Sequence, residues 1–344
     1  MRRILVRRPG GFARLEFVDE PDPVPRDDEV GIEASAIGVN FADCLVRMGL
    51  YASARRYVGW PITPGFEVSG RIFALGRGVT DFSVGDLVMA VTRFGGYATR
   101  VCAPRPLVRR LPNGLDALQG AAFQVAHLTA WYALTQCASI RPGAKVLIHS
   151  AAGGVGMAMV QLAKVRGAQV LGVVGRPHKM QAVLDLGADR VVDRQGGKLW
   201  EKVRQFAPAG FDLILDANGP GTLERGYRAL GVGGRLVTYG AHGLLSHGRS
   251  GRPNWWRLTL NLNRMPRFSP LSLVEHNRGV VGFNLSHLFD QIDLLQTAMD
   301  ELTSLLDSGR LARPQVQPFA FDAVADAHRA IESGETTGKL VLVV

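Results

Sequence analysis

The sequence predicts an α/β protein in which a compact β-rich domain is followed by a doubly wound parallel sheet. Two observations lead to this fold class: short strands separated by Pro and Gly fill the first third, and strands alternate with helices beyond Pro142. A third is a glycine turn that joins the first of the later strands to its helix. The 344 residues are enough for two domains, and the hydrophobic content of 47% allows a large core.

The first third is predicted to be rich in strands and loops. Apolar and polar residues alternate over short stretches, as in a half-buried strand, and turn residues such as those in 61–65 separate the stretches. The predicted strands are residues 29–34, 66–72, 87–91 and 97–101. Strands of this length and spacing are typical of a compact, barrel-like β domain.

From about residue 120 the pattern changes to one of alternating helices and strands. Helical spacing of apolar residues first predicts a helix over 121–136. The strands predicted after it are 145–150, 169–174, 190–192, 213–215, 235–239 and 279–283, with helices at 155–165, 179–186, 199–206 and 222–230. Six strands in this order favour a doubly wound dinucleotide-binding sheet.

The last part of the chain departs from this alternation. An amphipathic helix is predicted from Leu288 to about Asp307, followed by a helix near 323–333 and a final strand at 339–343. We expect this tail to fold back onto the first domain. The predicted domains are residues 1–121, 122–287 and 288–344, the last of which returns to the first.

Composition excludes several classes of protein. Three widely spaced cysteines argue against a disulfide framework and a structural zinc site. The net charge of +10 suits nucleic acid, anionic membranes or phosphorylated ligands, but no helix-turn-helix or basic-aromatic pattern accompanies it, so we predict no nucleic-acid binding. No apolar run is long enough for a membrane span or a secretory signal, which predicts a cytoplasmic protein.

The strongest motif is the turn from the strand ending at Ser150 into the next helix. A helix N-terminus offers free N–H groups and a positive dipole to a pyrophosphate. Gly153 lets the backbone approach the phosphates, and Gly156 lets the helix pack close to the sheet. Ala151 replaces the first glycine of the GxGxxG pattern, and a plain structural turn is the alternative. The predicted cofactor-binding residues of this turn are Ala152, Gly153, Gly154, Val155 and Gly156.

The residues after the second strand of this sheet indicate which dinucleotide binds. A carboxylate about 20 positions after the turn normally binds the ribose 2′-hydroxyl of NAD. The sequence has Gly175, Arg176 and Lys179 instead, and Arg194 follows the third strand. Because cations favour a 2′-phosphate, these residues predict NADPH; an ordinary solvated side chain is the alternative for any one base. Tolerance of NADH stays open.

Several stretches together resemble the medium-chain dehydrogenase/reductase superfamily over nearly the whole chain. They are residues 38–43, 64–67, 84–86, 151–156 and 338–341. Within the superfamily the zinc-free quinone oxidoreductase branch fits best, and the vesicle-amine-transport-protein-like group is most similar through residues 151–161, 237–240 and 281–283. The resemblance implies a GroES-like first domain, a Rossmann domain after it, and a homodimer whose sheets pair through the strand at 279–283.

The resemblance also allows a test for zinc. Zinc-dependent members of the superfamily carry Cys and His ligands where this chain has Asn40, Phe66 and Val125. These three residues are not a normal zinc ligand set, because zinc binds thiolate, imidazole or carboxylate groups. We therefore predict no metal site.

A bound NADPH still delivers hydride to an electron-poor carbon, such as that of a quinone or an α,β-unsaturated carbonyl. The resemblance places Asn40 and Tyr51 as catalytic residues, Asn40 as a hydrogen-bond donor to the carbonyl oxygen and Tyr51 as a donor or proton source. It places Asp43 at the same cleft, and Phe41 and His127 are the other predicted residues of the substrate pocket. The alternatives are that Asn40 and Asp43 cap a turn, that Tyr51 merely lines the pocket, and that His127 is a hydrogen-bonded residue at a helix end.

Further cofactor contacts are expected where the strands of the sheet end, because ligands of such folds bind there. Thr129, which with His127 is expected to open the helix across the domain junction, is implied to lie near the nicotinamide. Lys339 is a candidate for closing the cleft, with an ordinary surface lysine as the alternative. The residues expected at the strand ends are Asn218, Tyr239, Gly240, Phe283 and Asn284.

Residues 247–274 differ in composition from the rest of the chain. They contain five Arg and no Asp or Glu, with paired Trp255 and Trp256 and several leucines, a composition that suits weak contact with a membrane surface. A loop over the cleft and a dimer contact are the alternatives. Two functions therefore remain: an NADPH-dependent reductase of quinones or enones, and a non-enzymatic NADPH-binding protein of the same fold that docks at anionic lipid or a partner protein.

Overall fold

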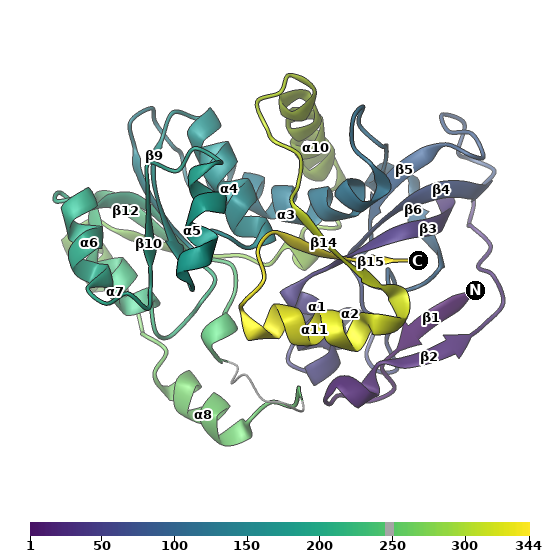
Figure 1. Ribbon diagram of the computed structural model, residues 1–344, viewed down its shortest axis with the longest axis horizontal. Helices are drawn as coiled ribbons and strands as arrows, with labels where there is room; N and C mark the ends of the chain where they lie inside the picture. The colour runs from purple at the N-terminus through teal and green to yellow at the C-terminus, as the bar shows by residue number, and fades with distance from the viewer. Residues whose placement is uncertain (245–250) are drawn as a thin grey trace.

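The computed structural model describes residues 1–244 and 251–344, and it consists of two lobes joined by a long helix (Figure 1). This helix is α3 (Ala117–Thr135). In Figure 1 a parallel sheet lies on one side of α3, and a mainly antiparallel sheet lies on the other side with both chain termini. The predicted boundary at residues 121 and 122 falls inside α3.

The parallel sheet has the strand order β10-β9-β8-β11-β12-β13, and its neighbouring strands run parallel. The first strand of the series, β8, lies in the middle, so the chain winds outward in both directions, which confirms the predicted doubly wound sheet. Its strands are β8 (Lys145–His149), β9 (Gln169–Val174), β10 (Arg190–Asp193), β11 (Phe211–Asp216), β12 (Leu230–Thr238) and β13 (Gly279–Gly282).

Helices cover both faces of this sheet, because its strands are apolar on both sides. The connecting helices are α4 (Gly154–Val165), α5 (Met180–Leu184), α6 (Leu199–Phe206) and α7 (Leu223–Arg228). Between β12 and β13 the chain forms α8 (Trp255–Asn263) and α9 (Pro270–His276), and Figure 1 shows α8 standing away from the sheet. Among the described residues, none of the helices has the length and apolar character needed to cross a bilayer.

The second sheet has the order β14-β15-β3-β4-β5-β7, and β6 pairs with β3. Its strands are β3 (Glu29–Val39), β4 (Glu67–Leu75), β5 (Leu87–Val91), β6 (Arg100–Pro104), β7 (Val108–Arg110), β14 (Val316–Ala320) and β15 (Lys339–Val343). β15 runs antiparallel to β3, so the tail returns to the first lobe as expected. A hairpin of β1 (Arg2–Leu5) and β2 (Glu16–Asp19) completes this lobe.

The strand expected at 97–101 begins only at Arg100. The backbone of Tyr97 instead bonds to two other segments, since its N–H donates to Pro64 and its carbonyl accepts from Ile4. The prediction for this strand is therefore wrong by three residues at its start, because these contacts hold Tyr97 outside the ladder with β3.

Two short helices, α1 (Phe41–Met48) and α2 (Ala52–Tyr57), follow β3 where only strands and loops were expected. Asn40 is the N-cap of α1, and its N–H donates to Asp43 Oδ2 at 2.8 Å in a capping box. Gly49, with φ of 77°, ends α1 in the left-handed conformation. Helices of this length are too short for their apolar spacing to mark them in the sequence.

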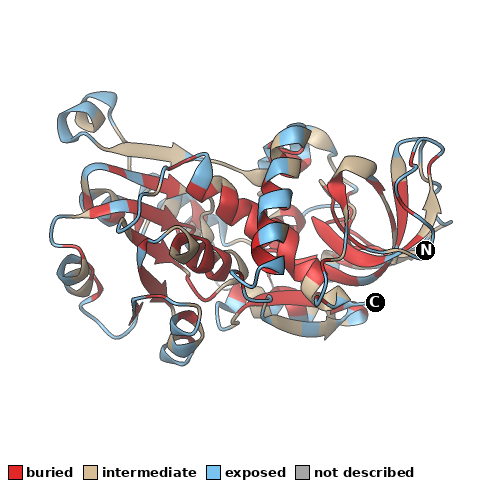
Figure 2. Cartoon of the chain, turned by 90° about the horizontal axis from the view of Figure 1, so that it is seen from above, coloured by how far each residue is buried: buried red, intermediate tan, exposed pale blue. Residues whose placement is uncertain are grey.

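The helix α3 starts earlier than its apolar pattern suggests. Asp116 and Gln119 form a capping box, with Gln119 N–H donating to Asp116 Oδ1 at 2.8 Å. The expectation that His127 and Thr129 open this helix is therefore wrong, and both lie well inside it. α3 is apolar all round and buried between the two lobes, where Figure 2 shows it in red. α10 (Ile292–Asp307) packs against it, and α11 (Val324–Ser333) leads into β15.

Close packing at Gly156 predicts a stability difference within the glycine turn. A Cβ on Gly156 would stand 2.3 Å from the carbonyl oxygen of Ser150 and 2.7 Å from Ala151 Cα, so α4 would have to move away from β8. We expect Gly156→Ala to lower the free energy of unfolding by about 1–3 kcal/mol, measured by urea denaturation. The control is Gly153→Ala, whose Cβ would lie 3.5 Å from the nearest atom. It should cost at most about 1 kcal/mol, the loss of a good N-cap. Equal losses in the two variants would contradict this account.

Candidate functional site

The loop between β8 and α4 presents a helix N-terminus at the carboxyl edge of the parallel sheet. Ser150 turns the chain with a φ of 55°, and Gly153 is the N-cap of α4. The N–H groups of the first helical turn have no intrahelical acceptor and carry the positive end of the helix dipole. A Cβ on Gly153 would make only an ordinary van der Waals contact, 3.5 Å from the carbonyl oxygen of Ser150. This arrangement suits a phosphate group.

The C-terminal strand of the other lobe touches this loop. The N–H of Gly338 donates to the carbonyl oxygen of Ala152 at 2.8 Å, and Gly153 forms a parallel bridge with Gly338. The next residue, Lys339, lays its aliphatic stem against Gly154, with Cδ 3.1 Å from the position of a Cβ there. Lys339 is therefore held beside the turn, although its ammonium group points elsewhere.

The ammonium group of Lys339 lies in a buried cluster with Asn40 and Glu67. Lys339 Nζ donates to Asn40 Oδ1 and to Glu67 Oε1, both at 2.5 Å. Asn40 Nδ2 donates to Glu67 Oε1 at 3.2 Å, and Glu67 Oε2 accepts from the N–H of Val125 in α3 at 2.9 Å. Because Oδ1 faces an ammonium group, the orientation of the Asn40 amide is fixed. In the described part of the chain, the second amide hydrogen of Asn40 has no acceptor.

Asp43 accepts hydrogen bonds from the backbone near Asn40. Its two oxygens accept from the N–H groups of Asn40 and Gly65, each at 2.8 Å, so it caps α1 as the alternative interpretation proposed. Burial raises the pKa of Asp43 to about 7, against the effect of these hydrogen bonds. Asp43 is completely buried, which leaves it no open face toward a substrate.

Tyr51 and Asn284 meet across the two lobes. Tyr51 Oη donates to Asn284 Oδ1 at 2.8 Å, and Asn284 also accepts from Ser286. The Tyr51 ring packs edge-on against Phe66 and Phe94. Burial raises the pKa of Tyr51, so its hydroxyl keeps its proton at neutral pH. The Tyr51 hydroxyl is therefore protonated, and in this structure it donates its hydrogen bond to Asn284.

His127 and Thr129 are occupied by α3 itself. His127 Nδ1 lies 2.7 Å from the carbonyl oxygen of Phe123, on whose ring the imidazole stacks, and Thr129 Oγ1 donates to the carbonyl of Val125 at 2.7 Å. Burial lowers the pKa of His127 to about 4, which makes the ring neutral and a poor proton donor at pH 7. The hydrogen-bonded alternative for His127 agrees with this geometry, although its place is inside the helix. Phe41, at the start of α1, packs its ring 4.0 Å from that of His242.

The three predicted phosphate-binding cations have different surroundings. Arg176 is paired with Glu335, and Lys179 Nζ donates to the carbonyl oxygens of Gly334 at 2.5 Å and Thr336 at 2.7 Å. Arg194 makes no side-chain hydrogen bond or ion pair with any residue that the structure describes. It lies within 3.8 Å of the Cβ position of Gly175. Arg194 also lines a cavity of about 680 Å³ with residues of α6 and α7.

The other predicted cofactor residues gather at the carboxyl edge of the sheet. Ser150 Oγ donates to Asn218 Oδ1 at 2.9 Å, which joins the ends of β8 and β11. Gly240, after β12, lies close to the backbone of Ala217. A Cβ added to Gly240 would stand 3.1 Å from the carbonyl oxygen of Ala217. Tyr239 and Phe283 stack with ring centroids 6.2 Å apart. The structure thus brings these residues together with the glycine turn, as the sheet topology predicts.

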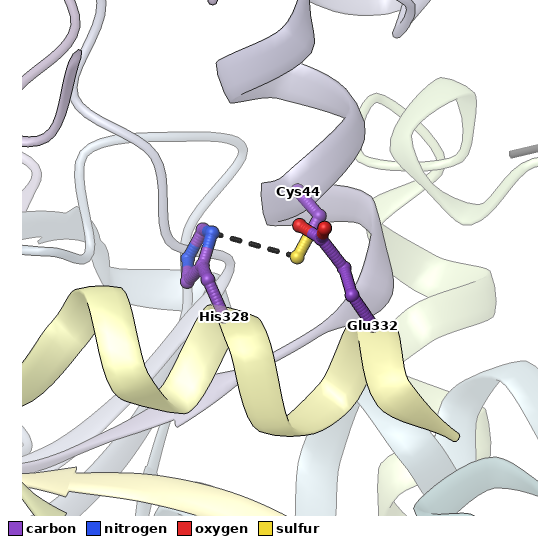
Figure 3. Close-up of side chains that lie close together, drawn as sticks. All are labelled: Cys44, His328 and Glu332. Atoms are coloured by element: carbon purple, nitrogen blue, oxygen red, sulfur yellow. Dashed lines mark hydrogen bonds between the residues drawn. The ribbon is translucent and has the colours of Figure 1, made fainter. Parts of the chain in front are cut away.

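One group of described side chains has the composition of a metal site. Figure 3 shows Cys44 on α1 pointing toward His328 and Glu332 on α11, with ligand atoms within 4.8 Å of one another. Arg47 occupies the same place, since its guanidinium lies 3.0 Å from His328 Nδ1 and 2.7 Å from Glu332 Oε1. A buried arginine already supplies the positive charge there. Burial also raises the pKa of the Cys44 thiol well above its usual value, which disfavours a thiolate ligand.

The segment of unusual composition is partly helical. Residues 247–250 lie outside the described residues, while α8 and α9 account for most of the remainder. Several large apolar side chains of these helices are exposed: Trp255 at 63%, Trp256 at 81%, Leu271 at 81% and Val274 at 80%. The apolar side chains that the composition of this segment suggested are therefore on the surface of the described structure.

Two side chains of the candidate site, Glu67 and Glu335, were not predicted from the sequence as site residues. Glu67 has a sequence signal, because it is a carboxylate at the start of a largely apolar strand, where a buried charge needs a partner. Glu335 has none, because it is 159 residues away from its partner Arg176.

Comparisons with known proteins agree with this architecture. The alcohol dehydrogenase GroES-like domain matches residues 26–114, and the zinc-binding dehydrogenase family matches residues 154–303. The synaptic vesicle membrane protein VAT-1 homolog of Rattus norvegicus is 31% identical over 97% of this chain and 82% of its own length. The crystal structure of Escherichia coli quinone oxidoreductase complexed with NADPH has a TM-score of 0.86 at 27% identity and covers 100% of both chains. That of CurK enoyl reductase has a TM-score of 0.84 at 26% identity, covering 99% of this chain and 98% of its own.

The two lobes, the glycine turn and these matches define an oxidoreductase of the NAD(P)-dependent type. The chain belongs to the medium-chain dehydrogenase/reductase superfamily and, within it, to the VAT-1-like, quinone oxidoreductase-like group. The resemblance expected from the sequence motifs is thereby confirmed.

The lowered pKa of His127 predicts a pH dependence of stability. An unfolded chain protonates this histidine near pH 6.5, whereas the folded chain does so only near pH 4, so stability is lost as the pH falls from about 6.5 to about 4. Between pH 7 and pH 5 this loss amounts to about 2 kcal/mol. We expect His127→Leu to reduce the drop in unfolding free energy over this interval by that amount, measured by urea denaturation at both values. The control His178→Gln, at an exposed site, should leave the drop unchanged. If the unfolding free energy of His127→Leu fell between pH 7 and pH 5 by as much as that of the unaltered protein, the lowered pKa of His127 would be refuted.

Proposed function

We propose that the protein is an NADPH-dependent reductase that transfers hydride to quinones or α,β-unsaturated carbonyl compounds without zinc. The observation that carries this proposal is the Asn40 amide: Lys339 and Glu67 fix its orientation, and its second hydrogen has no acceptor among the described residues. The amide lies next to the strand that touches the glycine turn. A donor beside a nicotinamide site is what a reduced carbonyl oxygen requires as its negative charge develops.

The donor set does not fit a catalytic zinc ion. At the three positions where zinc-dependent relatives carry ligands stand an amide, an aromatic ring and an aliphatic side chain: Asn40, Phe66 and Val125. The Asn40 oxygen is already 2.5 Å from the ammonium group of Lys339. A dication at this point would face that positive charge, so no step of the mechanism is assigned to a metal.

The residues do fit NADPH. The open N-terminus of α4 suits the pyrophosphate, and Arg194 and Arg176 lie at the ends of β10 and β9 where a 2′-phosphate would need cations. The nicotinamide of NADPH, when bound, supplies the hydride. The proposal agrees with a similar chain, E. coli quinone oxidoreductase, having been crystallised with NADPH.

The chain's own residues then provide orientation and charge stabilisation. Asn40 donates its free amide hydrogen to the substrate oxygen, and the ammonium group of Lys339 behind it polarises the amide. Tyr51 keeps its proton at neutral pH and supplies it to the reduced substrate after leaving Asn284. Phe66 and Phe94, packed against Tyr51, make this side of the site apolar.

This function is tested by following NADPH oxidation with a panel of quinones, enones and aldehydes, with NADH as the control cofactor. We expect turnover with quinones or enones, and we expect Asn40→Ala to lower kcat by about 10²-fold, because an oxyanion donor is lost. NADPH affinity should be unchanged in this variant, since the helix N-terminus and the cations remain. Tight NADPH binding with no turnover of any substrate class would overturn the reductase proposal.

A second candidate function, contact with an anionic membrane surface, is favoured by α8 and α9. Their exposed Trp255 and Trp256 accompany four arginines in residues 251–274, a stretch without Asp or Glu. We expect Trp255→Ala/Trp256→Ala to weaken sedimentation with phosphatidylserine vesicles by about tenfold or more, and high salt to weaken it in the unaltered protein. The control Val232→Ser removes an exposed apolar residue of β12 and should have no effect. Absence of vesicle binding would overturn this candidate function.

A further inference from the structure

The pair of Arg176 and Glu335 joins the two lobes at the predicted 2′-phosphate site. Arg176 Nε donates to Glu335 Oε1 at 2.8 Å and to Oε2 at 3.1 Å, and a terminal guanidinium nitrogen lies 2.5 Å from Oε1. A carboxylate that is bound by two nitrogens of an arginine presents its oxygens as a phosphate group would. Glu335 thus occupies the donors that a 2′-phosphate would use.

The backbone on either side of Glu335 is anchored. Lys179, a buried residue, donates to the carbonyl oxygens of the residues before and after Glu335, Gly334 and Thr336. Gly334, with φ of 69°, ends α11, and Gly338 is held by its hydrogen bond to Ala152. The backbone of loop 334–338 is therefore held at both ends and in the middle, which keeps the Cα of Glu335 near Arg176 although both side chains are partly exposed.

The electrostatics of this pair act against a doubly charged ligand. The hydrogen bond from Arg176 lowers the pKa of Glu335, so the carboxylate is ionised at neutral pH. A 2′-phosphate that approaches Arg176 must displace this carboxylate or accept a like charge beside it, and either costs free energy. A ribose 2′-hydroxyl carries no charge and meets neither cost.

We propose that Glu335 is a specificity-determining residue, which occupies Arg176 in place of the 2′-phosphate and thereby lowers the affinity for NADPH but not for NADH. The inference rests on the proposed function, because it concerns the nucleotide of that reaction. The three cations then differ in their availability to the 2′-phosphate. Arg194 is available to it, Lys179 is used to hold the loop, and Arg176 is available only when Glu335 moves away.

The test compares Glu335→Gln with the unaltered protein by calorimetric titration of NADPH and NADH at low salt, where exposed charges are least screened. We expect Glu335→Gln to tighten NADPH binding by about two- to fivefold, the range for an exposed ion pair, and to leave NADH binding unchanged. The matched control is Asp326→Asn, which removes the same charge from an exposed ion pair on α11 and should change neither affinity. Thermal unfolding checks that both variants are folded.

A second arm shows whether Glu335 acts through Arg176. In an Arg176→Gln background, Glu335→Gln should increase the affinity for NADPH no more than the control Asp326→Asn does, because no guanidinium group is left to be released. NADPH binding that is equal in the unaltered protein and in Glu335→Gln overturns the inference while leaving the proposed function intact. Weaker NADH binding in Glu335→Gln also overturns it, since Glu335 would then be a ligand of the ribose hydroxyl. Failure of the unaltered protein to bind either nucleotide overturns the proposed function, and this inference with it.

Discussion

The buried ion pair of Lys339 and Glu67 is the interaction on which the rest of the structure depends. Two charges removed from water are tolerated only if each finds partners, and here the partners come from β15, β4, α3 and the end of β3. Satisfying Glu67 therefore fixes the relative position of these four elements. Gly338, the residue before Lys339, donates to Ala152 in the glycine turn. The position of Lys339 therefore also determines where the glycine turn contacts the other lobe.

This constraint explains the chemical character of the site. The carboxylates of Glu67 and Asp43 are fully buried, and each is bonded by N–H groups or an ammonium group, so neither presents a free negative charge to a substrate. His127 is neutral at pH 7. The donors of this region are the Asn40 amide, which has one hydrogen without an acceptor among the described residues, and the hydroxyl of Tyr51, which is bonded to Asn284. These groups are what the proposed reduction needs, because hydrogen-bond donors stabilise the negative charge that develops on a carbonyl oxygen.

The sequence predicts those parts of the molecule that depend on local pattern. The strands of the parallel sheet, the glycine turn and the returning strand follow from periodicity and from glycine at positions that tolerate no side chain, such as Gly156. The partners of Asn40 and Arg176 could not be predicted without a known family, since 299 residues separate Asn40 from Lys339 and 159 separate Arg176 from Glu335. Capping explains the early start of α3, because the pair of Asp116 and Gln119 begins the helix before its apolar pattern starts.

The segment between α11 and β15 connects the two ends of the site. Glu335 at its beginning meets the guanidinium group of Arg176, and Lys339 at its end holds the Asn40 amide, with Gly338 bonded to the nucleotide loop between them. The segment is short, and hydrogen bonds hold its backbone at Gly334, Thr336 and Gly338. The proposed contact with the adenosine end of the nucleotide and the proposed donor at the substrate end therefore both adjoin one stretch of chain. This stretch belongs to the lobe that does not carry the nucleotide fold, which is why the two lobes form one site only when they are packed together.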